Sequence, residues 1–263
     1  MTSGVPGALD ALLADPASTA VLTDFDGTLA PIVADPGSAR ALPRAASVLS
    51  ALASNFAVVG VISGRPASFL AENLADADAS VHLVGLYGLE FVDDGNVRLV
   101  PEAEPWVPVV VEGLAAAGAQ APKGLEIEDK GASLTFHWRN APETEHWARS
   151  FAADWAQRSG LILQTGRMSV ELRPPVGADK GTVVESLASG CEAACFAGDD
   201  IGDLAAFEAL DRMAARGVRT IRMAVVDGES PPEIAAAADL VLRGPDEALR
   251  VLHELAHLAE RRA

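Results

Sequence analysis

Two aspartates stand one residue apart directly after an apolar run, in the segment Thr23-Asp24-Phe25-Asp26-Gly27-Thr28-Leu29. The preceding Val21 and Leu22 predict a buried strand that ends at Asp24. An aspartate at such a strand end can hold a metal ion or attack an electrophile, and a nucleophilic aspartate that forms an aspartyl-phosphate is an established catalytic strategy. The like charge of Asp26 opposes the ionisation of Asp24, so a cation is expected nearby. Taken alone, the segment is equally consistent with an ordinary Asp-Gly turn.

Three further polar segments each follow a predicted strand or open a predicted helix. They are Ser63-Gly64-Arg65, Asp179-Lys180-Gly181 and the acidic run Gly198-Asp199-Asp200-Ile201-Gly202-Asp203. Each has an ordinary explanation on its own, as a turn, a solvated lysine or a helix N-cap with a negative first turn. The carboxyl ends of parallel strands share one crevice, so we expect all three segments to meet Asp24 there. Their joint occurrence in this order favours a single functional site.

The combined set of side chains fits phosphoryl transfer, which needs a positioned nucleophile and neutralisation of charge around the phosphoryl oxygens. Asp24 is the candidate nucleophile, and Asp26 is the candidate acid and base. Ser63 offers a hydroxyl and a backbone N–H to a phosphoryl oxygen, and Lys180 offers a fixed positive charge. The carboxylates would repel one another without a cation, and Mg²⁺ suits them because it prefers hard oxygen ligands. The predicted metal-site residues are Asp24, Asp26, Asp199, Asp200 and Asp203.

The composition limits the kind of partner that this chain can bind. Its 263 residues, 49% of them hydrophobic, suffice for one large domain or two smaller ones. The net charge of -17 argues against a nucleic-acid partner, and it requires that a phosphate site be made positive locally. No apolar run reaches the eighteen or so residues of a membrane span. Cys191 and Cys195 give no disulfide framework, and the first residues do not form a secretory signal, so a cytoplasmic location is expected.

The order of the predicted elements favours the α/β class, with a Rossmann-like parallel sheet core and an inserted α+β cap domain. Core strands are predicted over 19–24, 57–62, 81–85, 194–198, 220–226 and 239–242. Core helices are predicted over 38–54, 67–74, 180–187, 204–215, 231–237 and 246–261. A hairpin over 91–100 turns at Asp94-Gly95.

A different rhythm occupies the middle of the chain. Helices are predicted over 109–117 and 143–158, and strands over 125–129, 133–138, 161–165 and 169–172. Prolines stand near both ends of this block, among them Pro105 and Pro174-Pro175. We therefore expect residues 1–104 and 175–263 to form the core and residues 105–174 to form an inserted domain.

In these residues the chain resembles the haloacid dehalogenase superfamily of phosphatases. The matching residues are Asp24-Phe25-Asp26-Gly27-Thr28, Ser63, Lys180 and Gly198-Asp199-Asp200 with Asp203. The resemblance implies that Asp24 becomes phosphorylated, that Asp26 is the acid and base, and that Mg²⁺ is held by Asp24, the Asp26 main-chain carbonyl and Asp199. It also implies that residues 105–174 are this superfamily's α/β cap, which sets substrate specificity.

A narrower resemblance is to the trehalose-6-phosphate phosphatases. It rests on residues 26–32 with Asp35-Pro36, and on three inserted segments, 128–130, 136–139 and 167–174. It implies hydrolysis of trehalose 6-phosphate, with a trehalose-6-phosphate synthase as a pathway partner. The segment Gly85-Leu86-Tyr87-Gly88-Leu89-Glu90 departs from the Gly-Ala-Glu-His-Gly of many members.

The inserted segments carry most of the substrate-binding candidates. Alternate residues of a strand point the same way, so Glu128 and Lys130 project together, as do Glu171 and Arg173. A row of solvent-facing charges is the ordinary alternative. The candidates are Arg65 in the core and Glu128, Lys130, His137, Arg139, Arg167, Glu171 and Arg173 in the insert.

Other functions remain open at this point. A phosphatase of sucrose or glucosylglycerol phosphate would share the same core, and a non-catalytic module could sense a sugar phosphate with it. The run His253-Glu254-Leu255-Ala256-His257 matches the H-E-x-x-H zinc pattern, but catalytic zinc needs a third protein ligand. The leucines around it, such as Leu252 and Leu258, indicate an ordinary amphipathic helix.

Overall fold

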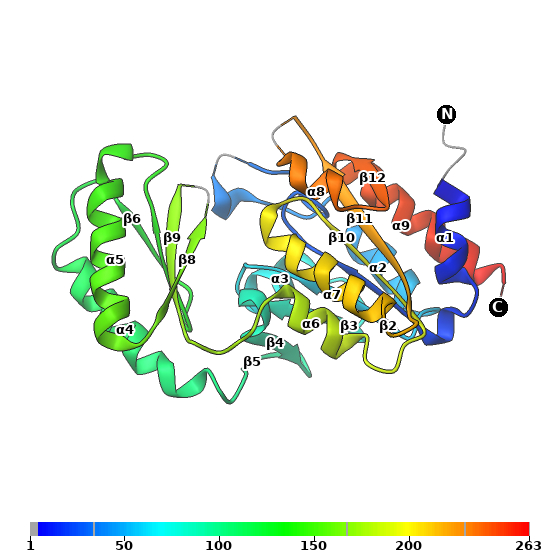
Figure 1. Ribbon diagram of the computed structural model, residues 1–263, viewed down its shortest axis with the longest axis horizontal. Helices are drawn as coiled ribbons and strands as arrows, with labels where there is room; N and C mark the ends of the chain where they lie inside the picture. Colours follow the sequence, from blue (N-terminus) through cyan, green and yellow to red (C-terminus); the bar gives the residue numbers. More distant parts are fainter. Residues whose placement is uncertain (1–4, 34, 167, 229, 263) are drawn as a thin grey trace. The chain divides into compact units, whose positions relative to one another are not determined.

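The structure is a computed structural model that describes residues 5–33, 35–166, 168–228 and 230–262. The chain folds into two compact units (Figure 1). One, here called the core unit, is built from the chain up to residue 98 and from residue 178 onward, and the other, the inserted unit, from residues 99–177. The segment predicted as an insert, residues 105–174, lies within the inserted unit.

The core unit is built on a mostly parallel sheet, whose described strands follow the order β12-β11-β10-β1-β2-β3-β4-β5. The strands are β1 (Thr19–Thr23), β2 (Val58–Ile62), β3 (Val81–Gly85), β4 (Glu90–Asp93), β5 (Asn96–Leu99), β10 (Ala193–Gly198), β11 (Arg219–Val226) and β12 (Leu240–Arg243). Strand β1 pairs in parallel with β10 on one side and β2 on the other, while β4 runs antiparallel to β3. The strand order therefore reverses around β1, which is where α/β sheets of this type bind ligands.

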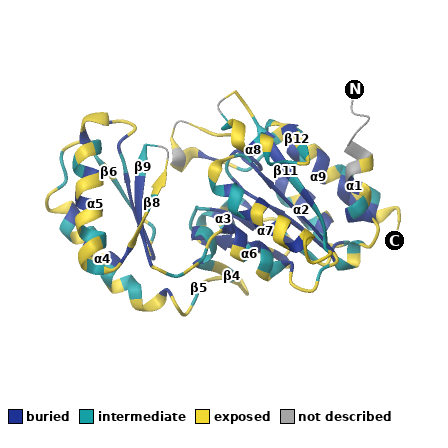
Figure 2. Ribbon diagram, viewed as in Figure 1, coloured by how far each residue is buried: buried dark blue, intermediate teal, exposed yellow. Residues whose placement is uncertain are grey.

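Helices cover both faces of this sheet because alternate residues of its strands face opposite sides. Val21 of β1 packs in a hydrophobic cluster with α1, α2 and α9, whereas Ala20 and Leu22 pack in a second cluster with α6 and α7. The central strands β1, β2 and β10 are buried, and the outer helix faces are exposed (Figure 2). The helices are α1 (Val5–Leu13), α2 (Ala45–Ala53), α3 (Ala67–Asn73), α6 (Lys180–Leu187), α7 (Leu204–Ala214), α8 (Pro232–Ala236) and α9 (Gly244–Glu260). The predicted Rossmann-like core is confirmed.

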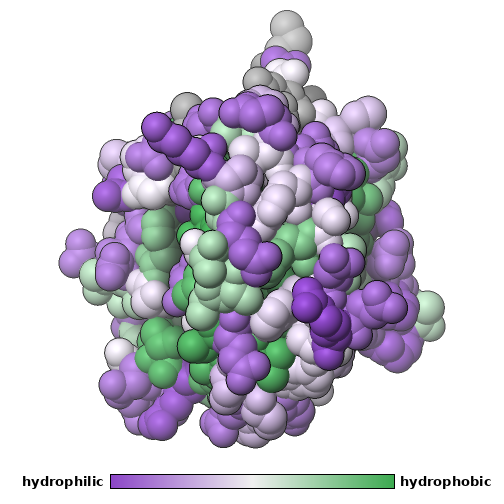
Figure 3. Space-filling view, turned by 90° about the vertical axis from the view of Figure 1, so that its left-hand side faces the viewer, coloured by the Kyte–Doolittle hydropathy of each residue, from purple (hydrophilic) through white to green (hydrophobic). Residues whose placement is uncertain are grey.

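The inserted unit is an antiparallel sheet backed by two helices. Its described strands follow the order β6-β7-β9-β8, and the helices are α4 (Val107–Gly118) and α5 (Glu145–Ser159). The strands are β6 (Glu126–Asp129), β7 (Leu134–His137), β8 (Ile162–Gly166) and β9 (Ser169–Arg173). Phe136 and Leu172 point into the cluster beneath the helices, where Phe151 stacks between Trp147 and Trp155. Seen from the side on which α4 and α5 lie, the surface mixes polar and apolar side chains (Figure 3).

Two helices differ from the sequence-based expectation. Helix α1 was not predicted, although Leu9, Leu12 and Leu13 are buried at helical spacing. Helix α2 begins at Ala45 rather than near residue 38. Leu42, which precedes Pro43, donates its N–H to the carbonyl of Leu29 (2.8 Å), and a residue before proline is disfavoured in the α conformation.

Candidate functional site

Asp24 lies one residue beyond the end of β1, at the carboxyl edge of the parallel strands. Its N–H donates to the carbonyl of Ala197 on β10 (2.8 Å), and its side chain is buried. Asp24 Oδ1 lies 2.9 Å from Nζ of Lys180, the first residue of α6. The same Nζ donates to Asp203 Oδ1 at 2.5 Å. The fold thus brings together three of the segments that the sequence analysis placed in one site.

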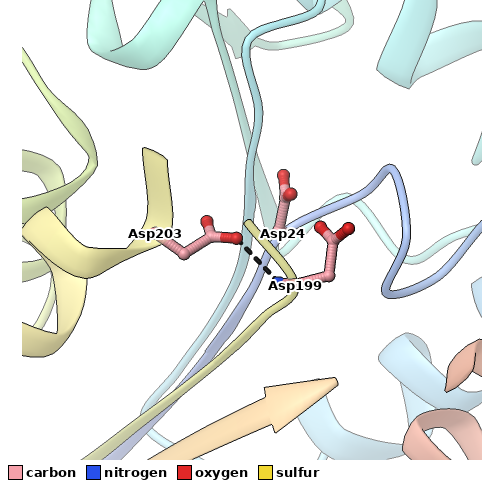
Figure 4. A group of neighbouring side chains, drawn as sticks. All are labelled: Asp24, Asp199 and Asp203. Carbon is pink, nitrogen blue, oxygen red and sulfur yellow. Dashed lines mark hydrogen bonds between the residues drawn. The ribbon is translucent and has the colours of Figure 1, made fainter. Parts of the chain in front are cut away.

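The turn after β10 adds a third carboxylate to this group. Asp24, Asp199 and Asp203 each place one carboxylate oxygen within 4.8 Å of the others. The carboxylates of Asp24 and Asp199 point the same way, whereas Asp203 turns toward the backbone of Asp199 (Figure 4). Asp203 Oδ2 accepts the N–H groups of Asp199 (2.8 Å) and Asp200 (3.1 Å), so this buried side chain fixes the shape of the turn.

Gly27 leaves the space that Asp199 occupies. Its φ of +70° is the left-handed conformation that favours glycine. A Cβ on Gly27 would lie 2.1 Å from Asp199 Oδ2, which real contacts do not allow. The glycine that follows Asp26 is therefore required by both backbone conformation and close approach.

The charges of this group do not balance. Burial raises the pKa of Asp24 well above its ordinary value, and Asp203 and Asp199 push it the same way while Lys180 opposes them. Burial, together with Asp203 and Asp200, raises the pKa of Asp199 to about 8. Burial lowers the pKa of Lys180, but Asp203 and Asp24 outweigh burial, so its pKa is well above the usual value. One ammonium group thus faces more carboxylates than it can neutralise, and this oxygen-only donor set fits a divalent metal ion.

The remaining predicted core residues surround this group in different ways. Asp200 is exposed, and its Oδ1 accepts the N–H of Gly202 (2.7 Å), so it lies outside the group of three carboxylates. Ser63 is buried directly after β2, and its Oγ accepts the N–H of Arg65 (3.2 Å). Asp26 is partly buried and forms an ion pair with Arg65.

A charged and polar face covers one side of the sheet in the inserted unit. The strand register aligns Glu128, Thr135, Glu171 and Gln164 in one row across β6, β7, β9 and β8. Side chains at directly paired positions share a face of the sheet. These four side chains therefore lie on the face that is turned away from α4 and α5. This row is here called the polar row.

Charges within and beside the polar row are paired. Lys130 Nζ lies 3.6 Å from Glu171 Oε2 and 3.9 Å from Glu128 Oε2. Ser133 donates its hydroxyl to Glu171 Oε1 (2.5 Å), and His137 Nε2 lies 2.8 Å from Glu128 Oε2. The sequence-predicted candidates Glu128, Lys130, His137 and Glu171 are therefore neighbours.

Other predicted candidates of the inserted unit are placed differently. Arg173 is buried and donates to Gln164, while Arg139 is exposed. Arg167 lies outside the described residues. The sequence analysis missed Thr135 and Gln164, although Thr135 stands two residues before His137 and therefore on the same face. The Thr135 hydroxyl oxygen is buried and has no hydrogen-bond partner among the residues that the structure describes.

The two histidines of the H-E-x-x-H run lie on the solvent-exposed face of α9. His253 and His257 are exposed, while Leu252 and Leu255 pack into the core. His253 Nε2 contacts a guanidinium nitrogen of Arg44 at 3.1 Å. Among the described residues, the group of potential metal ligands is that of Asp24, and neither histidine belongs to it.

Comparison with protein families gives a match along most of the chain. The trehalose-phosphatase family model matches residues 22–240. A trehalose-phosphate phosphatase from Mycolicibacterium paratuberculosis is 33% identical over 261 residues, which cover 92% of this chain and 63% of that protein. The chain thus spans less than two thirds of the length of this relative. Within the described residues, none of the helices combines the length and apolarity that crossing a bilayer requires.

Solved structures share the fold. A crystal structure of a trehalose-6-phosphate phosphatase related protein matches with a TM-score of 0.77 and 24% identity, covering 93% of this chain and all of that one. The C-terminal domain of the trehalose-6-phosphate phosphatase of C. albicans matches with a TM-score of 0.75 and 22% identity, covering 97% of this chain and 98% of that one. At these identities the likeness concerns the fold alone.

Proposed function

This chain belongs to the trehalose-phosphatase family, and we propose that it hydrolyses trehalose 6-phosphate to trehalose and inorganic phosphate with Mg²⁺ as cofactor. The observation that carries this proposal is the largely buried group formed by Asp24, Asp199 and Asp203 after β1 and β10 and by Lys180 at the start of α6. The name of the M. paratuberculosis relative supports the choice of sugar.

The first half of the reaction uses Asp24 as nucleophile. An Asp24 carboxylate oxygen attacks phosphorus, and the bond between phosphorus and the sugar oxygen breaks. Asp26 gives its proton to the departing oxygen, which leaves as the hydroxyl of trehalose. The phosphoryl group is then held on Asp24 as an aspartyl-phosphate.

The second half of the reaction returns the enzyme to its starting state. A water oxygen attacks phosphorus while Asp26 takes a proton from that water. The bond between phosphorus and the Asp24 oxygen breaks, which releases inorganic phosphate and restores the Asp24 carboxylate. Asp26 again carries a proton for the next leaving group.

The other core residues stabilise charge during both steps. Asp24, the Asp26 main-chain carbonyl and Asp199 would hold Mg²⁺, which when bound supplies positive charge beside the transferring phosphoryl group. Asp203 orients Lys180 and the 199–200 turn, because its oxygens already accept three N–H groups. Lys180 neutralises charge on the nucleophile and phosphoryl oxygens, and Ser63 donates to a phosphoryl oxygen.

We propose that residues 105–174 form the specificity domain and bind the sugar through the polar row. A carboxylate such as Glu171 accepts sugar hydroxyl protons, and Lys130 donates to sugar oxygens. These side chains hold one another in place in the structure, which preorganises them for a neutral polyol. A trehalose-6-phosphate synthase is the proposed supplier of the substrate.

A phosphate-release panel tests the proposal. Trehalose 6-phosphate, sucrose 6-phosphate, glucosylglycerol phosphate and phenyl phosphate are compared at equal concentrations, with Mg²⁺ and with EDTA. We expect the highest kcat/KM with trehalose 6-phosphate and no turnover in EDTA. A preference for another sugar phosphate would contradict the substrate, and Mg²⁺-independent turnover would contradict the cofactor. Tight binding without turnover would indicate a sensing module.

A further inference from the structure

The candidate acid and base, Asp26, forms a two-point ion pair with Arg65. Arg65 Nε lies 2.7 Å from Asp26 Oδ2, and Arg65 Nη2 lies 2.9 Å from Asp26 Oδ1. Both side chains are largely buried, with 17% and 27% of their surfaces exposed. Two parallel N–H···O bonds fix the direction of a carboxylate, whereas a single contact leaves it free to rotate.

Aromatic rings support the guanidinium of Arg65 from one side. Its central carbon lies 4.7 Å from the centre of the Phe69 ring, within the range of a cation–π contact. Phe69 in turn meets the edge of Phe25, with ring centres 5.6 Å apart and planes at 87°. Phe25 is the residue between Asp24 and Asp26, and it is fully buried. The ion pair is therefore tied through these rings to the backbone segment that carries the nucleophile.

The backbone of Arg65 is fixed by the turn that follows β3. Leu86 donates its N–H to the carbonyl of Arg65 (2.9 Å), and Tyr87 donates its N–H to the carbonyl of Ser63 (2.9 Å). Leu86 and Tyr87 have φ values of 48° and 57°, which residues other than glycine adopt at an energetic cost. The Tyr87 ring packs so closely that a Cβ on Gly64 would lie 2.5 Å from its Cζ.

These contacts distinguish Arg65 from the other buried cation of the site. Lys180 forms ion pairs with Asp24, which is also a proposed metal ligand, and with Asp203. Arg65 places two N–H groups on the carboxylate of Asp26, and its ring support and backbone clamp hold it there. This geometry is typical of a residue that orients a neighbouring carboxylate, here that of Asp26, rather than of a residue that binds substrate.

We propose that Arg65 is a positioning residue that orients the Asp26 carboxyl group for proton transfer, and that it does not bind the substrate. The inference rests on the proposed phosphatase function. When Asp26 carries a proton on one oxygen, its other oxygen still accepts an N–H from Arg65, so the orientation persists through both half-reactions. The strained Leu86–Tyr87 turn keeps the Arg65 backbone in the place that this requires.

A double-mutant cycle with Arg65→Met and Asp26→Asn tests this role in the full chain with saturating Mg²⁺. Arg65→Met should lower kcat about 30-fold to 100-fold, as expected for a displaced catalytic group, and change KM by less than about twofold. Asp26→Asn should lower kcat about 10²-fold to 10⁴-fold. Adding Arg65→Met to Asp26→Asn should lower kcat by no more than about twofold further, because both changes remove one function.

Conservative and control variants complete the experiment. Arg65→Lys keeps the charge but not the two-point fork, so it should recover part of the kcat lost in Arg65→Met. Arg222→Met removes an arginine of similar exposure, 24%, from an ion pair with Asp211 and Asp239, and it should leave kcat unchanged. Should Arg65→Met fail to fold, the same cycle with Arg65→Lys replaces it.

Two results would overturn the proposal. A KM that rises tenfold or more at constant kcat would make Arg65 a substrate ligand, and losses that multiply in the double variant would make the two residues independent. All variants are measured on trehalose 6-phosphate and on phenyl phosphate. Wild-type protein that hydrolyses phenyl phosphate but not the sugar phosphate overturns the substrate assignment alone, and the cycle on phenyl phosphate still decides the role of Arg65.

Discussion

Carboxylates in the two units are balanced in different ways. In the core unit, Asp24 is buried and Asp199 partly buried, both have raised pKa values, and Lys180 supplies too little charge to neutralise them. In the inserted unit, Glu171 receives the Ser133 hydroxyl and faces Lys130, and Glu128 meets His137. The first arrangement needs an added cation, whereas in the second each carboxylate already has a hydrogen-bonding partner and the two carboxylates share the ammonium group of Lys130. This difference supports our proposal that the core carries out the charge chemistry and that the insert recognises a neutral sugar.

The largest effect should follow from removing the nucleophile. Asp24→Asn should lower kcat on every phosphomonoester by about 10⁴-fold or more, because no other group takes over the covalent step. The folded state should persist, since asparagine fills the same space without a buried charge. Phosphate release and circular dichroism measure the two outcomes, with Asp211→Asn on the surface of α7 as the control. An Asp24→Asn variant with near wild-type turnover would exclude Asp24 as the nucleophile.

The unbalanced core charges should appear in the pH dependence of stability. The pKa of Asp199 is about 8 in the folded protein against an ordinary value of 3.8, so the folded state holds more protons than the unfolded state between these values. Stability without metal should therefore fall as pH rises through this window. Mg²⁺ needs ionised carboxylates, so it should raise the melting temperature more at pH 8 than at pH 6.

Thermal melts in EDTA and in excess Mg²⁺ at pH 6, 7 and 8 measure this difference. Asp199→Asn should weaken the pH dependence in EDTA, where Asp24 also has a raised pKa, and should reduce the stabilisation by Mg²⁺. An increase in melting temperature by Mg²⁺ that is equal at pH 6 and pH 8 would mean that the raised pKa of Asp199 is not linked to metal binding.

A change in the inserted unit should affect recognition and leave the chemistry intact. Glu171→Gln should raise KM for trehalose 6-phosphate about tenfold, because the loss of one hydrogen bond to a charged group weakens binding by about this factor. It should change kcat by less than about threefold. Phenyl phosphate has no sugar, so its kinetics should stay unchanged. Glu145→Gln on the exposed face of α5 is the matched control. Equal losses on both substrates would place Glu171 in the chemical step instead.

The smallest effect is expected at Thr135. Its buried hydroxyl has no hydrogen-bond partner within the described part of the chain, and valine has nearly the same shape. Thr135→Val should therefore keep or raise the melting temperature while raising KM for trehalose 6-phosphate about threefold, if a sugar hydroxyl meets Thr135 in the complex. An unchanged KM would contradict a sugar contact at Thr135 and would leave Glu128, Glu171 and Gln164 as the sugar-binding members of the polar row.

The bounds of helices and strands are predicted correctly from the sequence where neighbouring residues set them, and less well where contacts with distant residues set them. The predictions for β3 over 81–85 and for α6 over 180–187 are confirmed to the residue, because apolar runs and an Asp-x-x-Thr cap mark their ends. The start of α2 was wrong, since a distant carbonyl, that of Leu29, takes the N–H of Leu42. No local pattern reports that long-range bond, although Pro43 is a local signal against a helical Leu42.

The candidate site also has features that the sequence could predict and features that it could not. The meeting of Asp24, Lys180 and Asp199 follows from strand ends and could be predicted from spacing. The pairing of Arg65 with Asp26 could not, because it depends on side-chain directions in two loops that are far apart in the chain. The left-handed turn at Leu86 and Tyr87 was also hidden, since neither residue is a glycine. The row through Thr135 and Gln164 needed the strand register.

The central claim is that Asp24 carries the phosphoryl group between the two half-reactions. The direct measurement is an acid quench of wild-type protein with Mg²⁺ and trehalose 6-phosphate during turnover, followed by mass spectrometry of its peptides. We predict one added phosphoryl group on Asp24, removable by hydroxylamine, and none in Asp24→Asn or in EDTA. Rapid turnover with no phosphoryl group on Asp24 at any quench time, or with the label on another residue, would contradict the account.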